Sequence, residues 1–372
     1  FQTGDIKAAN FYLTEYSQTY SDEGLAQSKL WKPGTLCITI AANIAESAIL
    51  GIEGCFPDSV VGFVADDEKV DVRFIKYYME ILKLQMQSVS RGTTQDNLSL
   101  DKLLTFDFLV PPLAIQQRIA GILSAYDDLI ENCQRRISIL EAMARKLYRE
   151  WFVHFRFPGH ERHPRVNSPL GEIPKGWEVR KLGEVAEEMR RNVPKGQLDE
   201  PTPYVGLEHI PRRSIALDAW EMTTELGSNK LEFKKGEILF GKIRPYFHKV
   251  SIAPFNGLCS ADTIVIRSRQ SEYYACVVGC VSSDAFVAEA SATANGAKMP
   301  RASWSVLSKY PIVVPQIELG STFSSIVTNL ISQQQLLIAK IQTLRRTRDL
   351  LLPRLLSGQM AVGGEEIEEL LR

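Results

Sequence analysis

The strongest constraint on the fold is an internal repeat, because the second half of the sequence follows the first at an offset of about 200 residues. Matching segments keep the same order in both halves and share lysine, glycine, cysteine, aspartate or proline at equivalent places. The matched pairs are Leu25–Leu30 with Leu226–Leu231, Lys32–Ile38 with Lys234–Phe240, Cys55–Val61 with Cys259–Val265, and Val110–Pro111 with Val314–Pro315. The chain is therefore predicted to be one structural unit written twice.

The two copies differ at their beginnings. The first copy has no counterpart for roughly residues 168–203 of the second copy. The sequence also opens at Phe1, inside what looks like an ongoing motif. We therefore expect an N-terminal piece to be missing and the first copy to be N-terminally incomplete.

Each copy has the same internal order. Short runs of β-branched and apolar residues between glycines are typical of strands, as in Thr35–Ile40, Ser59–Val64 and Ala261–Ile266. Residues 72–88 are expected to form a helix. Prolines follow at 111, 112 and 315, at positions where the start of a helix tolerates them. Each copy is thus predicted to be a strand-rich region followed by a long helix.

The first long helix carries a seam of apolar residues spaced three and four positions apart, which is a heptad pattern with one irregularity at Cys133. About 37 residues at about 1.5 Å each span about 55 Å, longer than a small domain can cover. Burying each large side chain is worth about 1.5–3 kcal/mol, so the two helices are expected to pair. The seam positions are Ile115, Ile119, Ile122, Tyr126, Leu129, Cys133, Ile137, Leu140, Ala144, Leu147 and Trp151, matched by Leu319, Phe323, Ile326, Leu330, Leu337, Ile341, Leu344, Leu351 and Leu355.

The predicted fold class is α+β, with two similar α/β domains separated by a pair of long antiparallel helices and related by an approximate two-fold repeat. The expected boundaries are a first domain over residues 1–110, a central long helix over 111–157, a linker and second domain over 158–316, a distal long helix over 317–360, and an acidic tail over 361–372. Two similar modules at a set separation suit a two-part target. On duplex DNA, a spacer of this length would place them about one helical turn of 34–36 Å apart, or somewhat more.

Composition narrows the functional classes. The chain is 45% hydrophobic and 23% charged, with no apolar stretch of 18 residues and no secretory leader, so we expect a cytoplasmic protein that does not contact a membrane. Its six cysteines form no C-x-x-C pair and are expected to be core residues or free thiols. Residues 1–110 hold nine basic and 15 acidic side chains, and residues 168–316 hold 19 and 17. Charge alone therefore does not indicate a nucleic-acid binder.

Near matches to catalytic motifs fail in detail. Gly236–Ile243 fits a phosphate-binding loop except that Ile243 replaces the serine or threonine that would hold magnesium. Asp58 with Asp67–Lys69 imitates the carboxylate and lysine set of a metal-dependent nuclease, but the second copy keeps only Asp262 of that set.

The sequence also shows no convincing motif for metal binding or methyl transfer. His160 and His163 have no further ligand at a convincing spacing. No motif for amino-methylation and no glycine-rich cofactor loop is present, so base flipping and methylation are expected to belong to a partner. We predict no catalytic residue and no metal ligand in this chain.

A series of short motifs occurs in a fixed order along the chain, and together they are specific. They are Gly92–Gln95, Val110–Leu113, Gln116–Ile119, Tyr148–Gly159, Leu170–Trp177 and Leu352–Gly358. In this combination the sequence resembles the specificity (S) subunits of Type I restriction-modification systems over essentially its whole length.

The resemblance implies two target-recognition domains, each reading one half of a split, asymmetric sequence in double-stranded DNA. It implies that the paired helices dock two methyltransferase (M) subunits and, through them, the restriction and translocation (R) subunits. It further implies that the chain is not itself an enzyme and carries no cofactor. S-adenosylmethionine, ATP and magnesium are then expected only on the partner subunits.

The loops differ between the copies where the framework matches. Thr39–Glu46 is neutral to acidic, whereas its counterpart Gly241–His248 is basic and aromatic. Gly92–Asn97 likewise stands opposite Gly296–Arg301. We interpret the divergence as two modules that read different base sequences, and unconstrained drift of the loops stays open as an alternative.

Candidate DNA-contacting residues lie in these loops. Lysine and arginine side chains contact phosphates or read guanine, aromatic rings and histidine pack against sugar or base, and glutamine and asparagine favour adenine edges. For any one of them an ordinary exposed loop side chain is the competing interpretation. The candidates are Thr93, Thr94, Gln95 and Asn97 in the first copy and Lys242, Arg244, Tyr246, His248, Lys298 and Arg301 in the second.

Two functions of different classes remain open from the residues themselves. One is a DNA-reading subunit without catalysis. The other is a protein-interaction scaffold that bridges two partners through its helices. The basic and aromatic loop of the second copy favours the former, and the acidic balance of the first copy favours the latter.

Overall fold

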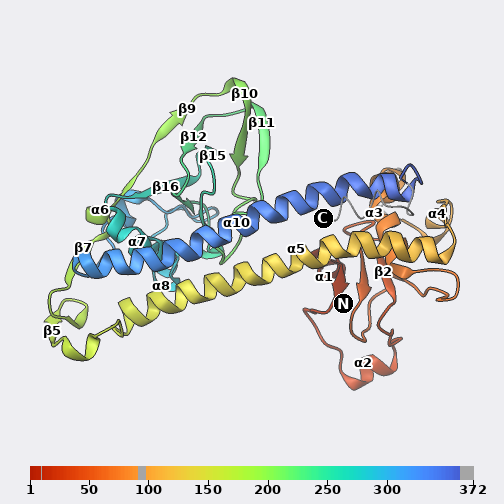
Figure 1. The fold of residues 1–372 in the computed structure, drawn as a ribbon, viewed down its shortest axis with the longest axis horizontal. Coiled ribbons are helices and arrows are strands. Elements are labelled where there is room, and N and C mark those ends of the chain that lie inside the picture. Colours follow the sequence, from red (N-terminus) through yellow and green to blue (C-terminus); the bar gives the residue numbers. More distant parts are fainter. Residues whose placement is uncertain (10, 91–97, 361–372) are drawn as a thin grey trace. The chain divides into compact units, whose positions relative to one another are not determined.

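The computed structural model describes residues 1–9, 11–90 and 98–360. The chain divides into two compact units (Figure 1). Unit 1 comprises Phe1–Glu131 with Thr343–Arg372, and unit 2 comprises Asn132–Gln342. The division falls inside both long helices, α5 (Leu113–Tyr148) and α10 (Ile317–Leu356), so each unit contains a part of each helix.

Unit 1 is built on a four-stranded sheet in the order β1-β3-β2-β4. The strands are β1 (Tyr12–Leu13), β2 (Leu36–Thr39), β3 (Ser47–Leu50) and β4 (Val60–Phe63). β2 pairs antiparallel with both β3 and β4, and all residues of β2 and β3 are buried. The helices of this unit besides α5 and α10 are α1 (Thr3–Ala8), α2 (Asp22–Ala26), α3 (Val72–Ser90) and α4 (Leu100–Leu103).

Unit 2 contains a four-stranded sheet in the order β14-β13-β16-β8, whose first three strands match β3-β2-β4 of unit 1. The fourth strand differs, because β1 lies beside β3 in unit 1 and β8 lies beside β16 in unit 2. Its strands are β13 (Ile238–Gly241), β14 (Val250–Ile252), β16 (Thr263–Ser268) and β8 (Ala186–Glu188). The central strand β13 lies antiparallel between β14 and β16, as β2 lies between β3 and β4. The sequence repeat is therefore confirmed as a repeated fold, and the strands predicted around residues 35–40, 59–64 and 261–266 are present.

A second sheet occurs in unit 2 and extends away from the helices in Figure 1. Its order is β11-β10-β15-β12-β9, and its strands cover Leu226 and Leu231, which are buried. The matching Leu25 and Leu30 of the first copy are exposed. The strands are β9 (Arg191–Val193), β10 (Gly196–Val205), β11 (Glu221–Leu226), β12 (Lys230–Phe233) and β15 (Gly257–Ser260).

Smaller elements complete unit 2. β7 (Glu178–Lys181) pairs antiparallel with β17 (Pro311–Val314), and β5 (Arg165–Ser168) forms a hairpin with β6 (Gly171–Pro174). A π-helical turn, Arg149–Val153, follows α5. The remaining helices are α6 (Leu182–Val185), α7 (Tyr274–Val281), α8 (Asp284–Ala292) and α9 (Trp304–Leu307), with short 3-10 turns at His160–Arg162, Pro245–Phe247 and Ser271–Tyr273.

The two long helices run antiparallel within each unit. In unit 1, Ile119 and Leu123 of α5 share a core cluster with Leu355 of α10. In unit 2, Trp151 contacts Phe323 of α10 with ring centroids 5.2 Å apart. The expected fold class is thus confirmed: two similar α/β regions with a pair of long antiparallel helices.

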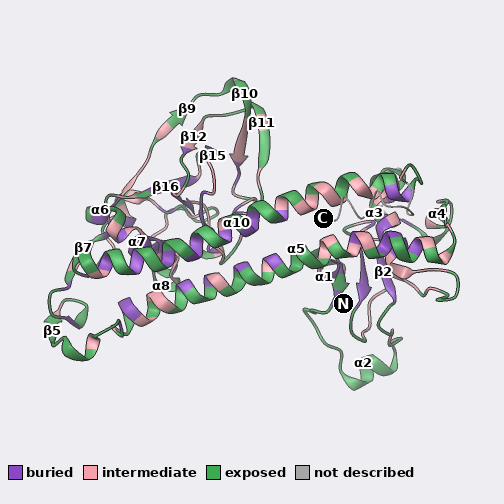
Figure 2. Cartoon of the chain, viewed as in Figure 1, coloured by how far each residue is buried: buried purple, intermediate pink, exposed green. Residues whose placement is uncertain are grey.

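The buried face of these helices is wider than one heptad seam. Buried residues, purple in Figure 2, recur along both helices. Seam positions Leu129 and Ile326 are exposed, and their neighbours Ile130 and Val327 are buried instead. A straight α-helix drifts about 20° per heptad, so a strict seam cannot stay on one line. Val327 also joins the core of the globular region of unit 2, which takes the buried face beyond the helix pair.

The copies differ in the helix that packs beneath their sheets. α3 is continuous over 19 residues, whereas its counterpart in unit 2 is broken into α7 and α8. The break occurs at two serines, Ser282 and Ser283. The Ser283 hydroxyl accepts a hydrogen bond from the backbone N–H of Phe286 at 3.2 Å and so caps α8.

All six cysteines are free, and five of them are buried. No single described helix is long and apolar enough to cross a membrane. The bent pair Ser271–Val281 and Asp284–Ala292 passes that test by length and composition only, and its apolar side chains belong to the core of unit 2.

Candidate nucleic-acid interface

The loop that joins β13 to β14 in unit 2 has a backbone held in an unusual shape. Arg244 and His248 both adopt the left-handed conformation, with φ of 48° and 53°, on either side of the turn Pro245–Phe247. Non-glycine residues adopt positive φ only where the surroundings fix them. Strand β13 and the antiparallel β14 supply that fixed frame, with Gly241 N–H donating to Lys249 O at 2.8 Å.

A second loop, Asn295–Arg301, is joined to the first by backbone hydrogen bonds. Arg244 N–H donates to Pro300 O at 2.8 Å, and Ala302 N–H donates to Lys242 O at 2.9 Å. Ile243 also forms a β-bridge with Arg301. The structure therefore brings together two loops whose hydrogen-bonded residues lie 56 and 60 positions apart in the sequence. We call the set Lys242, Arg244, Tyr246, Lys298 and Arg301 the recognition surface.

The cations of the recognition surface are only lightly engaged. Lys242 Nζ donates to the carbonyl of Ala261 at 3.2 Å, and Arg301 Nε lies 3.5 Å from Asp262 Oδ1. Half of the Arg301 side chain is exposed, and Lys298 and Tyr246 are exposed as well. Arg244 Nε is buried and has no hydrogen-bond partner in the described part of the chain. The exposed donors of Lys298 and Arg301 can turn to a phosphate or a base edge without giving up a strong internal ion pair.

His248 lies elsewhere, although it ends the same loop. Its side chain is buried, with Nε2 2.9 Å from the carbonyl oxygen of Ser282 and Nδ1 3.5 Å from Asp284 Oδ1. The ring faces the α7–α8 break and not the solvent. The structure thus separates His248 from the other five sequence candidates of this copy.

The matching loop of unit 1 has a similar backbone and a different chemistry. Ala42, Asn43 and Ala45 adopt positive φ values. Glu46 pairs with Lys83 of α3 at 2.7 Å, and the Asn43 side chain accepts from Lys7 at 3.2 Å. The other candidates of this copy, Thr93, Thr94, Gln95 and Asn97, lie outside the described residues.

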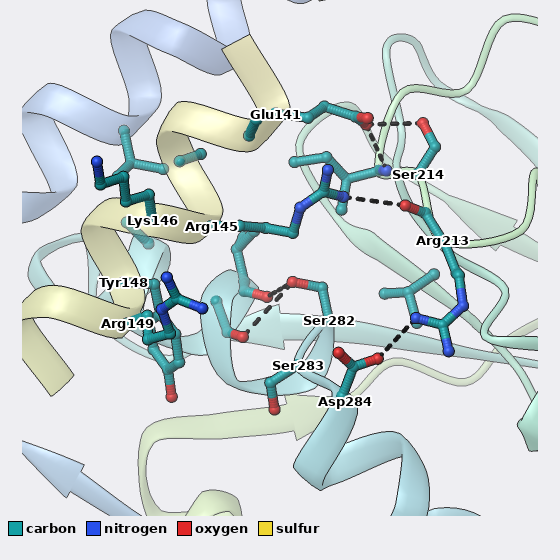
Figure 3. A pocket seen from close by; sticks show the side chains of 18 of the residues that line it. Glu141, Arg145, Lys146, Tyr148, Arg149, Arg213, Ser214, Ser282, Ser283 and Asp284 are labelled. Atoms are coloured by element: carbon teal, nitrogen blue, oxygen red, sulfur yellow. Dashed lines mark hydrogen bonds and ion pairs between the residues drawn. The ribbon is translucent and has the colours of Figure 1, made fainter. Parts of the chain in front are cut away.

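A cleft of 640 Å³ lies in unit 2 between the C-terminal part of α5 and the α7–α8 break (Figure 3). Its floor is apolar and includes Val278, Phe323 and Val327. Polar groups stand around it, and Figure 3 shows Arg145 and Lys146 of α5 and Arg149 of the π-helical turn on one side, with Arg213 and Asp284 on the other. Arg213 Nη1 pairs with Asp284 Oδ1 at 2.9 Å.

A buried carboxylate closes one end of the cleft. Glu141 of α5 is 5% exposed and accepts three hydrogen bonds, from Ser214 Oγ at 2.7 Å, Ile215 N–H at 2.7 Å and Ala216 N–H at 3.1 Å. One turn further along α5, Arg145 Nη1 donates to the carbonyl of Arg213 at 3.0 Å. These contacts fasten the segment Arg213–Ala216 to the helix.

The polar residues at the cleft do not form a nucleophile and base pair. The hydroxyls of Ser282 and Ser283 donate to the helix carbonyls of Val278 and Cys280, each at 2.7 Å. The His248 imidazole faces a backbone carbonyl and not either hydroxyl. Burial raises the pKa of the nearby Cys280 thiol to about 12, so it stays protonated near neutral pH. This arrangement organises backbone and does not activate an attacking atom.

The motif near matches are also explained by the fold. Ile238–Gly241 is the central strand β13 and not the strand-to-helix turn of a phosphate-binding loop. Lys69 pairs with Asp66 at 2.7 Å on the surface of unit 1. Among the residues that the structure describes, no three histidine, cysteine or acidic side chains converge as metal ligands.

Sequence reasoning missed Glu141, Arg145, Arg213 and Ser214. Glu141 occupies a polar place in a helix, where a glutamate is normally solvated, and its partners are 73 to 75 residues away. Its position three residues before the seam residue Ala144 was the one available signal, because residues three apart share a helix face.

Comparison with known proteins places the chain in a family. The family model described as "Type I restriction modification DNA specificity domain" matches residues 2–142 and 174–346. The Type I restriction enzyme MjaIX specificity subunit of Methanocaldococcus jannaschii is 25% identical over 94% of this chain and 84% of that protein. The EcoDI specificity subunit of Escherichia coli is 24% identical over 79% of this chain and 70% of that protein.

A solved structure shares the fold. The S subunit of a Type I restriction-modification system from M. genitalium aligns with a TM-score of 0.54 at 15% identity, over 88% of this chain and 84% of that one. The double match of the family model falls on the two copies of the repeat, each with a sheet and parts of the long helices. The chain belongs to the DNA specificity family of Type I restriction-modification systems.

Proposed function

We propose that this chain is the subunit that gives a Type I restriction-modification complex its DNA sequence specificity, by reading one half of a bipartite, asymmetric site with each copy of its repeat. The observation that carries the proposal is the pair of matching sheets, β3-β2-β4 and β14-β13-β16, with loops of unlike chemistry at equivalent ends. A shared frame with divergent loops is suited to two different base sequences. Family membership does not favour the alternative of a scaffold that reads no DNA.

The recognition surface supplies the chemistry for one half-site. Lys242 and Lys298 suit phosphate contacts, because an ammonium group binds phosphate as a point charge. Arg244 and Arg301 suit bidentate readout of guanine, and Tyr246 can pack on a sugar or base. In the first copy, Thr93, Thr94, Gln95 and Asn97 remain the candidates by residue type, with glutamine and asparagine suited to adenine.

The long helices are the proposed docking elements for two methyltransferase subunits, through which the restriction subunits join. The chain itself would catalyse nothing and hold no cofactor, with S-adenosylmethionine, ATP and magnesium bound by those partners. Because such a complex acts on chromosomal DNA, we expect it in the cytoplasm.

Mapping methylated bases across the host genome tests this function most directly. Deleting the gene for this chain should abolish one bipartite adenine mark, and restoring it should restore the same mark. A fluorescence titration of the complex with its methyltransferase subunits should then show preference for duplexes that carry this site. An unchanged methylation pattern after deletion would support the scaffold alternative.

A further inference from the structure

The segment Arg212–Ala216 of unit 2, which we call the strap, lies along the free edge of β14. Arg213 N–H donates to His248 O at 2.9 Å, and Ile252 N–H donates to Ile215 O at 2.9 Å. β-bridges join Arg212 to Lys249 and Ala216 to Ile252. β14 is the strand that receives the chain from the loop of the recognition surface. The strap therefore holds that loop at its far end.

The strap is bound to α5 by a buried carboxylate, Glu141, and an exposed guanidinium, Arg145. The Glu141 carboxylate receives two backbone N–H groups and one hydroxyl of the strap, and Arg145 adds a bond to the carbonyl of Arg213. Hydrogen bonds to a charged group are stronger than neutral ones and fix direction more sharply. With only 5% of Glu141 exposed, water cannot readily replace these donors.

The strap is also tied to the α7–α8 break. Arg213 pairs with Asp284, and the same carboxylate lies 3.5 Å from His248 Nδ1. Figure 3 shows Glu141 directed at Ser214 and the Arg213 guanidinium directed at Asp284. A continuous series of contacts thus links α5, through the strap, to His248, which ends the loop that carries Lys242, Arg244 and Tyr246. We call this loop the recognition loop.

We propose that Glu141 is a positioning residue for DNA specificity: it fixes the recognition loop of the second copy relative to α5 and so helps to set the distance between half-sites that the complex accepts. This rests on the proposed function. Apolar contacts also hold the domain on the helix, since Leu140, Ala144 and Leu147 of α5 belong to the core cluster of unit 2 or pack against it. Without the bonds to Glu141 and Arg145, these contacts would leave the strap free to shift, because apolar burial is not directional.

The role predicts a particular failure. Replacing Glu141 with alanine should leave the domain folded and the base preference of each half-site in place, because the side chains that read bases are untouched. Discrimination between the correct half-site spacing and spacings one base pair shorter or longer should fall about tenfold, the worth of one charge-assisted hydrogen bond. Glu141→Gln keeps one acceptor oxygen and should recover most of the discrimination.

The experiment uses the complex with its methyltransferase subunits and the site found by methylation mapping. Wild type, Glu141→Ala, Glu141→Gln and the control Glu318→Ala, an exposed glutamate of α10, are titrated against two duplex series. One series varies the gap between half-sites, and the other changes single bases within them. Hydrogen exchange of the peptides that span residues 213–216 and 242–250 is followed in parallel.

The expected result is faster exchange in both peptides of Glu141→Ala and a loss of spacing discrimination only, with Glu318→Ala unchanged. Spacing discrimination equal to wild type in Glu141→Ala would overturn the positioning role. So would an equal loss in both duplex series, which indicates a general structural defect. If wild type itself prefers no duplex in either series, the proposed function fails, and that outcome is distinct from a failure confined to Glu141.

Discussion

The two copies fasten their domains to the long helices with different polar contacts. In unit 1, the Tyr77 hydroxyl of α3 donates to Asp127 of α5 at 2.5 Å, and Asp127 pairs with Arg348 of α10. In unit 2, Glu141 and Arg145 of α5 hold the strap. The residue that matches Glu141 in the repeat is Arg345, so its charge is reversed.

This difference teaches which parts of a duplicated fold stay fixed. The order and register of three strands, β3-β2-β4 and β14-β13-β16, recur in both copies, as do the apolar helix faces. The polar contacts between domain and helices do not recur. A hydrogen-bonded network stabilises a fold only when all its members are paired, so one complete network can be replaced by another. Substitutions that act on one unit alone test how far the two copies behave independently.

The largest effect is expected from the equivalent core residues Phe323 and Ile119. Phe323 is fully buried against Trp151 and Phe152, and Phe323→Ala should destabilise unit 2 by about 3–5 kcal/mol. Ile119→Ala should destabilise unit 1 by about 2–5 kcal/mol. Hydrogen exchange resolved along the sequence measures each unit. Equal loosening of both units by either variant would show that they unfold as one.

The next largest effect is expected at the contact of Tyr77 and Arg348 with Asp127 in unit 1. Asp127→Ala removes the shared acceptor of Tyr77 and Arg348 and should destabilise unit 1 by about 2–3 kcal/mol, because the Tyr77 hydroxyl then lacks its partner and Arg348 keeps only its contact with Asp349. Asp128→Ala, an exposed neighbour on the same helix, is the matched control. Denaturant unfolding with exchange detection should show the loss in unit 1 and leave the strap of unit 2 as in wild type.

A smaller effect is expected at the recognition surface. Arg244→Ala should weaken DNA binding by about 1–3 kcal/mol and relax preference at one position if its guanidinium reads a base. Lys242→Ala should weaken binding evenly across sequences and lower the salt dependence by about one phosphate contact. Titrations at several salt concentrations separate the two. Unchanged affinity and preference in Arg244→Ala would remove that residue from the interface.

The smallest effect is a pH dependence. Burial, together with the neighbouring Asp127 charge, raises the pKa of Tyr77 well above its ordinary value of 10. The unfolded chain then loses its phenolic proton first, so stability is fully present below pH 10 and falls as pH rises further, by up to about 1.4 kcal/mol per pH unit. Tyr77→Phe should flatten this alkaline decline in unit 1 while leaving that of unit 2, which urea unfolding between pH 9 and 11 can measure.

Much of the fold follows from patterns in the sequence. Short runs of β-branched and apolar residues between glycines predict the strands, and a helix expected over residues 72–88 occurs as α3. The prediction of an apolar seam on the long helices is confirmed, but it is wrong at Leu129 and Ile326, which are exposed. The spacing of apolar residues cannot show that a helix packs on a domain as well as on the other long helix. The repeat predicted the shared frame because both copies carry the same apolar spacing.

Less of the candidate site than of the fold could be predicted from the sequence. The residue types of the two loops suggested contact with DNA, and the structure brings Lys242, Arg244 and Arg301 together by backbone bonds that no local pattern encodes. His248 was grouped with them by proximity in the chain, but its left-handed backbone turns the ring into the interior. The role of Glu141 could not be predicted from the sequence, because the groups that donate hydrogen bonds to its carboxylate lie in a distant segment.

Ala45 and His248 each lie two residues before the first residue of the following strand, β3 or β14, and share a positive φ, of 62° and 53°. The turn is thus imposed by the strands on either side and tolerates an alanine or an imidazole alike. A designer who wished to redirect this protein to a new target could keep every backbone angle of the loop and exchange only the outward side chains. The backbone frame would stay constant, and a few exchangeable side chains would determine which DNA sequence the protein binds.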